Sequence, residues 1–334
     1  MLLLDEIYEQ PAVLSRGLEL NSAVAAQARA LLTRSDVHHI VIAARGTSDN
    51  AARYAKYVWG TRLGIPVTLA APSMYTRYDA HPDLTGAAVV GISQAGQSPD
   101  LLAVLEAGRA AGRPTLTLTN DPGSPLATLS DVVMPLHAAP EESIAATKSY
   151  TASLLAIAMI ASDSDELKQV PGAVSEALAT ERLVREAVSR MGPFGQAVVL
   201  GRGYNHATAF EWAIKLQEMA YVLAIPYSTA DFAHGPFALL EPGFPLLAVI
   251  SEGTLTQDGL AIIRRAAQET DASITVMTNA SVPDLPTVQM PAMPEWLSPL
   301  MLIVPGQLFT LALAQLRGVD PESPRGLIKV TRTS

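Results

Sequence analysis

The chain has 334 residues, of which 49% are hydrophobic and only 16% are charged, and its formal net charge is −9. This length favours two domains, and the low share of charged residues indicates a buried subunit interface. The negative net charge disfavours nucleic acids and anionic membranes as partners. Because the chain has no cysteine, disulfides, thiolate zinc sites and cysteine nucleophiles are excluded.

The sequence predicts neither a signal peptide nor a membrane span. The residues at positions 5 and 6 are acidic, whereas a signal peptide needs a basic region near its start. The longest apolar stretch, residues 296–316, is interrupted by Pro299, Pro305 and Gly306, which favours a packed helix pair over a membrane helix. We therefore expect a soluble cytoplasmic protein without a membrane partner.

The first half of the chain alternates predicted helices and strands. One or two helices are expected from Glu6 to about Arg34, where apolar residues recur at helical spacing. Strands are then expected at residues 37–44, 66–70, 89–92, 115–120 and 132–136, with helices between them. Strands that alternate with helices predict βαβ units and a parallel sheet.

The second half repeats this pattern at a nearly constant offset. Segments ending at Gly203, Ser251, Asn279 and Pro291 match segments ending at Gly46, Ser93, Asn120 and Pro135, at offsets of 156 to 159 residues. Such a repeat predicts a duplication. The expected fold class is α/β, with two tandem, doubly wound, flavodoxin-like parallel-sheet domains. We expect an N-terminal helical segment (1–35), a first domain (36–161), a helical linker (162–191), a second domain (192–316) and a C-terminal tail (317–334).

Residues 89–100 have the pattern of a buried strand, a tight loop of small polar residues and a helix start. Ser98 suits the N-cap and Pro99 suits the first helical position. Because the loop between them carries no bulky side chain, its backbone amides can approach an anion such as a phosphate. On these residues alone, an ordinary βα turn explains the pattern equally well.

The matching loop of the second copy differs chemically. It has Glu252 where the first copy has Gln94, so a carboxylate would stand where a phosphate has to sit. The sequence therefore predicts that only the first copy retains a phosphate site, at the carboxyl end of a parallel strand.

Glu211, Lys215 and Glu218 are spaced to share one face of a predicted helix. The usual meaning of this spacing is a solvated stripe of ion pairs. The other residues of this helix are largely apolar, however, and charges on a buried helix are costly unless they are paired or functional. Both interpretations remain open on the sequence alone.

Two further positions have an ordinary and a functional interpretation. His234 precedes a Gly-Pro pair, where a histidine is commonly a turn residue. Lys329 lies near the chain end, where a frayed basic tail is the default, although the apolar residues 327, 328 and 330 can anchor it. The remaining histidines show no metal-ligand spacing, and we interpret them as structural.

Glycines follow two predicted strands, at 45–48 and at 201–203, so a dinucleotide site has to be considered. Neither segment completes Gly-x-Gly-x-x-Gly, and no acidic residue ends the next strand of the first copy. The sequence therefore disfavours a dinucleotide cofactor.

Taken together, the motifs resemble those of the SIS (sugar isomerase) superfamily. They are Gly-Thr-Ser at 46–48, Ser-Gln-x-Gly-x-Ser at 93–98, Ala-x-Thr-Lys at 145–148, Glu-x-Ala-x-Lys-x-x-Glu at 211–218, His-Gly-Pro at 234–236 and the C-terminal Lys329. The pattern is similar to the isomerase half of glucosamine–fructose-6-phosphate aminotransferases. The forms that three of these motifs take here are more similar to stand-alone SIS-type amino-sugar-6-phosphate deaminases. They are Arg-Gly-Thr-Ser-Asp at 45–49, Ser-Gln-Ala-Gly-Gln-Ser-Pro-Asp at 93–100 and Ala-Ala-Thr-Lys-Ser-Tyr at 145–150.

The resemblance implies a homodimer that acts on a sugar 6-phosphate without a metal or another cofactor. The residues implied in substrate binding are Gly46, Thr47, Ser48, Ser93, Gln94, Gly96, Ser98, Ile144, Ala145 and Thr147. Glu218 would move a proton between C1 and C2 of the sugar, supported by Lys215 and Glu211. His234 would open the sugar ring in the neighbouring subunit's site, and Lys329 would meet the ketose carbonyl.

The chain also departs from the family pattern. Ala95 and Ala146 replace family serines, Ala233 replaces a lysine, and no cysteine is present for a glutaminase reaction. The function expected from the resemblance is therefore a deaminase–isomerase that interconverts glucosamine 6-phosphate with fructose 6-phosphate and ammonia. The alternatives are a deglycase of phosphorylated fructose–amine adducts, an aminotransferase subunit fed with ammonia by a partner, and a sugar-phosphate sensor. The sequence leaves gluco and galacto substrates equally open.

Overall fold

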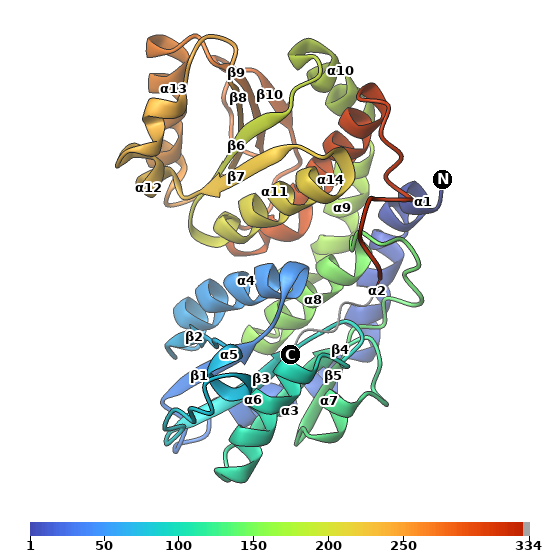
Figure 1. The fold of residues 1–334 in the computed structure, drawn as a ribbon, viewed down its shortest axis with the longest axis vertical. Helices are drawn as coiled ribbons and strands as arrows, with labels where there is room; N and C mark the ends of the chain where they lie inside the picture. Colours follow the sequence, from blue (N-terminus) through green and yellow to red (C-terminus); the bar gives the residue numbers. More distant parts are fainter. Residues whose placement is uncertain (330–334) are drawn as a thin grey trace. The chain divides into compact units, whose positions relative to one another are not determined.

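The computed structural model describes residues 1–329, which form two units, each built around a parallel sheet (Figure 1). The first-sheet unit comprises Ala12–Glu142, Lys148–Lys168 and residues 328–329. The second-sheet unit comprises Met1–Pro11, Ser143–Thr147 and Gln169–Leu327. The chain therefore passes between the two units several times.

The first-sheet unit contains five parallel strands in the order β2-β1-β3-β4-β5. The strands are β1 (His39–Ala43), β2 (Val67–Leu69), β3 (Ala87–Ile92), β4 (Thr115–Thr119) and β5 (Val132–Pro135). The helices are α2 (Gln10–Leu20, from residue 12 on), α3 (Ser22–Leu32), α4 (Gly46–Arg62), α5 (Ser73–Thr76), α6 (Pro99–Ala110), α7 (Pro125–Thr128) and α8 (Lys148–Ala161). This strand order is that of flavodoxin-like folds.

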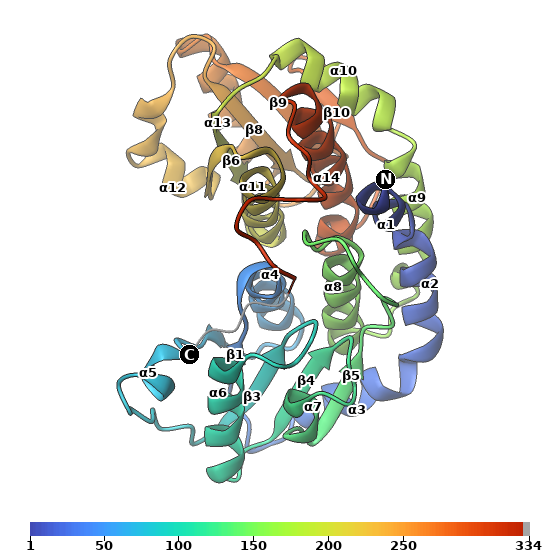
Figure 2. The same cartoon turned by 45° about the vertical axis from the view of Figure 1, so that its right-hand side comes forward.

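Helices cover both faces of this sheet, which explains why β3 is apolar throughout and completely buried. Figure 2 shows α4 and α8 on the face opposite to α6 and α7. Val89 of β3 packs with Val104 and Leu105 of α6 in one hydrophobic cluster. On the other face, all fourteen residues of α8 are buried, so α8 is a core helix of this fold.

The second-sheet unit also has five parallel strands, in the order β10-β9-β8-β6-β7. The strands are β6 (Gln196–Gly201), β7 (Leu223–Tyr227), β8 (Pro245–Ile250), β9 (Ser273–Thr278) and β10 (Thr287–Gln289). The α-helices are α1 (Leu2–Tyr8), α9 (Val170–Leu178), α10 (Glu181–Met191), α11 (His206–Ala220), α12 (Thr229–Ala233), α13 (Thr256–Glu269) and α14 (Ser298–Leu316). Short 3-10 turns of this unit are η2 (Gly203–Asn205), η3 (Pro236–Leu239) and η4 (Glu295–Leu297). A further turn, η1 (Asp165–Gln169), belongs to the first-sheet unit up to residue 168.

Counted from β7, the second sheet has the same strand order as the first, so the predicted fold class of two doubly wound parallel sheets is confirmed. The sequence prediction missed β7, the counterpart of β2. Among the described strands it pairs with β6 alone, it contains Pro226, and it leaves Leu223 64% exposed. Proline and irregular burial are typical of an edge strand. Such a strand lacks the continuous apolar run from which a buried strand is predicted.

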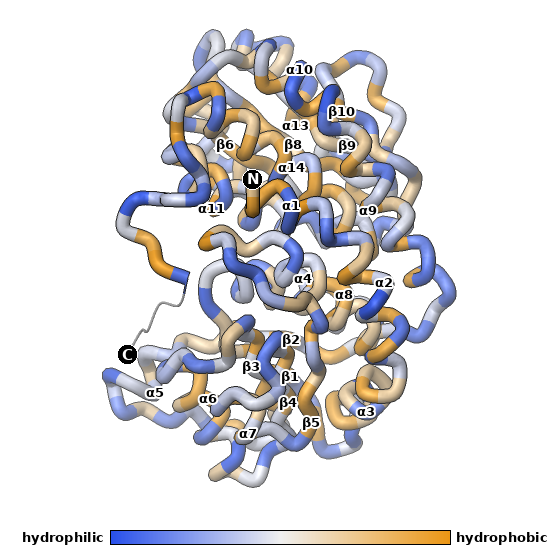
Figure 3. The backbone as a smooth tube through the Cα atoms, turned by 90° about the vertical axis from the view of Figure 1, so that its right-hand side faces the viewer, coloured by the Kyte–Doolittle hydropathy of each residue, from blue (hydrophilic) through white to orange (hydrophobic). Residues whose placement is uncertain are grey.

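The apolar stretch near the C-terminus forms the single helix α14, so the predicted helix pair was wrong (Figure 3). Pro299 lies in its first turn, where no amide is needed, and Pro305 lies inside the helix without ending it. Gly306 lets the Trp212 ring of α11 approach, because a Cβ here would lie 3.0 Å from Trp212 Cγ. Among residues 1–329, α14 with the preceding turn is the one segment that could span a membrane by length and composition, but it is wholly buried in the protein.

Candidate active site

The predicted phosphate loop, residues 93–98, follows β3 and leads into α6. Gly96 has a φ of +61°, and its N–H donates to Ser93 Oγ at 3.1 Å, which braces the turn. Ser98 has the extended backbone of an N-cap, but its hydroxyl makes no cap bond to α6. Among the described residues, no protein acceptor bonds the amides of Gln94, Ala95, Gln97 or Ser98. The loop therefore presents free donors at a helix N-terminus, as an anion site does.

We predict that Gly96→Ala distorts this loop. A Cβ at position 96 would lie 2.2 Å from Ser124 Oγ, in addition to the strain of a positive φ. Gly64→Ala is a matched control, because Gly64 has a φ of +70° but open space around it. In urea unfolding, the control is expected to lose about 1 kcal/mol from strain alone. Gly96→Ala is expected to lose about 2 kcal/mol more from overpacking, and equal losses would contradict the collision.

The matching loop of the second-sheet unit is closed by the protein's own side chains. Glu295 Oε2 accepts from the Thr254 amide at 3.0 Å, and Asn279 Oδ1 accepts from the Glu252 amide at 2.8 Å. The donors that would bind a phosphate are therefore occupied. The sequence prediction assigned the blocking carboxylate to Glu252, but that side chain is exposed and Glu295 takes this place. This difference supports a phosphate site in the first copy only.

The Gly-Thr-Ser segment starts α4, at the same edge of the sheet as the loop. Strands β1 and β3 pair in parallel up to Ala43 and Gly91, so their carboxyl ends lie side by side. Gly46 has a φ of +53° and allows the chain to turn directly into α4, which brings Thr47 and Ser48 to this edge. The sequence-based site residues of the first-sheet unit thus gather as expected for an open α/β sheet.

Two ion pairs at this edge were not predicted. Arg45 Nε donates to Asp100 Oδ2 at 2.8 Å, which ties the start of α4 to the start of α6. The Asp100 side chain is only 2% exposed, so Arg45 compensates a buried charge close to the loop. Burial raises the pKa of Asp49 in the first turn of α4, while Arg53 at 3.0 Å acts against this shift. These cations reduce the repulsion that a phosphate would meet here.

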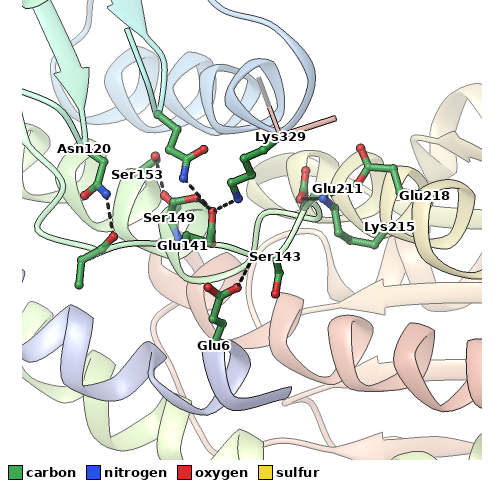
Figure 4. A network of polar contacts seen from close by, with 12 residues as sticks. Glu6, Asn120, Glu141, Ser143, Ser149, Ser153, Glu211, Lys215, Glu218 and Lys329 are labelled. Atoms are coloured by element: carbon green, nitrogen blue, oxygen red, sulfur yellow. Dashed lines mark hydrogen bonds and ion pairs between the residues drawn. The ribbon is translucent and has the colours of Figure 1, made fainter. Parts of the chain in front are cut away.

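Lys329 is bound to Glu141 within the first-sheet unit (Figure 4). Its Nζ lies 3.2 Å from Glu141 Oε2, and the Glu141 side chain is completely buried. The predicted apolar anchoring of the tail was wrong, because Leu327 is 40% and Ile328 is 69% exposed. Val330, the third residue of that prediction, lies outside the described residues. An ion pair with a buried carboxylate, which the sequence analysis did not identify, holds Lys329 in its place.

Glu211, Lys215 and Glu218 form a chain of ion pairs on α11 in the second-sheet unit (Figure 4). Lys215 Nζ lies 2.7 Å from Glu218 Oε2 and 3.4 Å from Glu211 Oε1. The side chain of Glu211 is 0% exposed and that of Lys215 is 1% exposed, whereas that of Glu218 is 25% exposed. The solvated-stripe interpretation is therefore wrong. One accessible carboxylate is backed by a buried cation and a second, buried carboxylate.

The remaining predicted site residues also lie in the second-sheet unit. His234 follows the last turn of α12, where its amide donates to Asp231 O at 3.1 Å and its side chain is exposed. Its predicted role in a neighbouring subunit stays a prediction. In the segment 143–147, Ala145 and Thr147 are buried and Ile144 is half-buried. The Ser143 amide donates to Glu6 Oε2 at 3.3 Å and fixes the start of this segment (Figure 4).

Both halves of the chain match the sequences of known proteins. The SIS domain model matches residues 35–162 and 194–317. Glutamine–fructose-6-phosphate aminotransferase (isomerizing) of Thermococcus kodakarensis is 32% identical over 349 residues, which cover 98% of this chain. The match covers 57% of that relative, so the chain spans little more than half of its length.

Solved structures have the same fold over the whole chain. One is the C-terminal domain of glucosamine–fructose-6-phosphate aminotransferase from Francisella tularensis, with a TM-score of 0.88, 25% identity, and coverage of 97% of this chain and 98% of that chain. Another is glucosamine-6-phosphate deaminase from Thermotoga maritima, with a TM-score of 0.81, 22% identity, and full coverage of both chains. With two matched SIS domains in tandem, the chain belongs to the SIS domain family.

Proposed function

We propose that this protein is an amino-sugar-6-phosphate deaminase–isomerase, which interconverts glucosamine 6-phosphate with fructose 6-phosphate and ammonia. The observation that carries this proposal is the ion-pair chain of α11. Glu218 is the accessible end of a chain whose other members, Lys215 and Glu211, are buried. Buried charges are retained where they serve a site, and a carboxylate is a suitable base for a proton next to a carbonyl or imine carbon.

The proposed chemistry needs one isomerisation, in which two protons change place, and one hydrolysis. In the open-chain aldose, Glu218 takes the proton from C2 and returns it to C1. A second proton passes from the C2 amine to O1, so that C1 becomes an alcohol and C2 an imine. Net addition of one water then releases ammonia and leaves fructose 6-phosphate. The ion pair with Lys215 at 2.7 Å keeps the Glu218 carboxylate oriented between the two steps.

Lys329 and His234 would act at the steps before and after this transfer. The Lys329 amine would attack the C2 imine, ammonia would leave, and water would then hydrolyse the resulting lysine ketimine. His234, whose side chain is exposed, would move the proton that opens the sugar ring of a substrate bound to a second copy of the chain. The loop at 93–98 and the start of α4 would hold the 6-phosphate.

A specific observation also favours a second candidate, the isomerase half of an ammonia-fed aminotransferase. The relative from Thermococcus kodakarensis is a glutamine–fructose-6-phosphate aminotransferase, and the chain matches 57% of its length. The present 334 residues contain no cysteine that could release ammonia from glutamine. This candidate therefore runs the same reaction in the synthetic direction, with ammonia supplied from elsewhere.

The test is to incubate the protein with glucosamine 6-phosphate and to measure both ammonia and fructose 6-phosphate. Equal amounts of the two products are expected, and galactosamine 6-phosphate and a phosphorylated fructose–lysine adduct serve as alternative substrates. Release of a free amino acid from the adduct, without ammonia from either hexosamine, would favour the deglycase. Binding of fructose 6-phosphate without turnover of any substrate would contradict an enzyme and favour a sensor.

A further inference from the structure

The buried carboxylate of Glu141 lies between two parts of the candidate site of the first-sheet unit (Figure 4). Its Oε2 accepts from Lys329 Nζ at 3.2 Å and from Gln94 Nε2 of the phosphate loop at 3.2 Å. The same oxygen accepts from the Ser149 hydroxyl at 2.6 Å. A single atom is therefore shared by the tail lysine, the loop amide and the first turn of α8.

The position of this carboxylate is fixed by α8. Its Oε1 accepts from the Ser149 amide at 3.1 Å, and a helix N-terminus stabilises a negative charge at this point. The helix itself is completely buried, and the Glu141 side chain has no exposed surface. A buried carboxylate requires hydrogen-bond donors and a countercharge, and Ser149 and Lys329 supply them.

The ion pair with Glu141 also bears on the C-terminal tail. Residues near a chain end are commonly poorly ordered unless they are tied down, and Leu327 and Ile328 are exposed. The ion pair to Glu141 is one contact that holds Lys329 beside the loop. An amine attacks a carbonyl or imine carbon through an unprotonated nitrogen, so Lys329 has to leave this ion pair when it reacts.

We propose that Glu141 is a positioning residue that couples occupation of the phosphate loop to the placement and reactivity of Lys329. It holds the Gln94 amide and the Lys329 ammonium on one oxygen. A phosphate that draws Gln94 toward itself removes one donor from that oxygen and changes the hold on Lys329. This inference rests on the proposed function, because Lys329 and the loop are assigned to the same substrate there.

The experiment compares Glu141→Gln with Glu142→Gln, which is the same substitution on the adjacent, exposed carboxylate. The first readout is the rate at which trinitrobenzenesulfonate modifies Lys329, followed by peptide mass spectrometry. Glu141→Gln is expected to raise this rate about fivefold by releasing the ion pair, and Glu142→Gln should leave it unchanged. The second readout is calorimetric binding of inorganic phosphate, which should be about fivefold tighter in Glu141→Gln. Coupling between two sites is reciprocal, and in this variant Gln94 no longer has to leave a charged acceptor when it turns toward the phosphate.

The third readout is turnover of the amino-sugar phosphate. Glu141→Gln is expected to lower kcat about a hundredfold through misplacement of Lys329. Added to Lys329→Gln, it should cause little further loss, because both changes remove the same interaction. Losses that multiply in the double variant, or a Lys329 labelling rate equal to that of the wild type, would overturn the inference. If Glu141→Gln fails to fold, Glu141→Asp serves for the same comparisons. It keeps a carboxylate but shortens the side chain by one methylene, which withdraws the acceptor from Lys329 and Gln94.

These readouts separate the inference from the proposed function. Labelling and phosphate binding need no turnover. A wild type that binds phosphate but converts no amino sugar would therefore contradict the proposed function and leave this inference open to the test. In that case the labelling rate and the phosphate affinity of Glu141→Gln still decide for or against the coupling. A wild type that binds no phosphate would overturn both.

Discussion

Replacing Glu218 with glutamine is expected to lower kcat about a thousandfold, because the substitution removes the proposed base of the proton transfer. Glutamine has nearly the same shape, and the Glu218 side chain is 25% exposed, so the fold should persist. The measurement is release of ammonia and fructose 6-phosphate from glucosamine 6-phosphate, with thermal unfolding as the check on folding. A matched control is Glu176→Gln, which removes an exposed carboxylate from α9 of the same unit.

An isotope experiment isolates the step at which Glu218 acts. In deuterated water, the wild type should exchange the C1 proton of fructose 6-phosphate even without ammonia, provided that the proton transfer is reversible. Glu218→Gln should lose this exchange together with turnover. Retained exchange in the variant, or full turnover, would show that another group moves the proton. Loss of turnover with intact exchange would place Glu218 in ammonia release instead.

Both halves of the fold could be predicted from the sequence because their strands are buried on both faces. Strands such as β3 and β8 are continuous apolar runs that follow one another at a constant offset in the two halves. Edge strands lack this signal, which is why β7 was missed. The continuity of α14 was also not predictable, because whether a proline interrupts a buried helix depends on the tertiary packing around it.

The loop of the candidate site was predictable for a local reason. Small residues, a tight turn and a helix start follow each other within the segment 93–99, and each of these features depends on a few neighbours. The partners of Lys329 and Arg45 depend on contacts across the fold, to Glu141 and Asp100. A weak signal existed for one of them, since Glu141 and Glu142 are two acids directly before a small-residue segment. The sequence does not reveal which of these two acids is buried.

Replacing Lys215 with methionine is expected to destabilise the protein by about 3–5 kcal/mol, because it leaves the Glu211 carboxylate buried without its cation. The Glu211 side chain has no exposed surface, and Lys215 lies 3.4 Å from it and 2.7 Å from Glu218. Glu218 is accessible to water and tolerates the loss of its partner better. The measurement is the free energy of unfolding from urea titration, followed by circular dichroism.

The control for this prediction is Arg182→Met on α10, whose ion pair with Glu186 has the same i,i+4 spacing. Its two side chains are 78% and 56% exposed, so its loss should cost about 0.5 kcal/mol at most. The double variant Glu211→Gln/Lys215→Met removes both buried charges and should regain most of the stability lost in Lys215→Met. Equal losses in the single and double variants would show that Glu211 is not held as a buried anion by Lys215.

The same double variant separates stability from catalysis. A buried ion pair replaced by neutral side chains of similar volume often leaves stability unchanged, so folding alone gives little reason for three charges on α11. If they serve the proton transfer, the double variant should fold almost normally and still be strongly impaired in turnover, since Glu218 has lost the cation that orients it. Normal turnover in a stable double variant would mean that Glu218 needs no support from the buried pair.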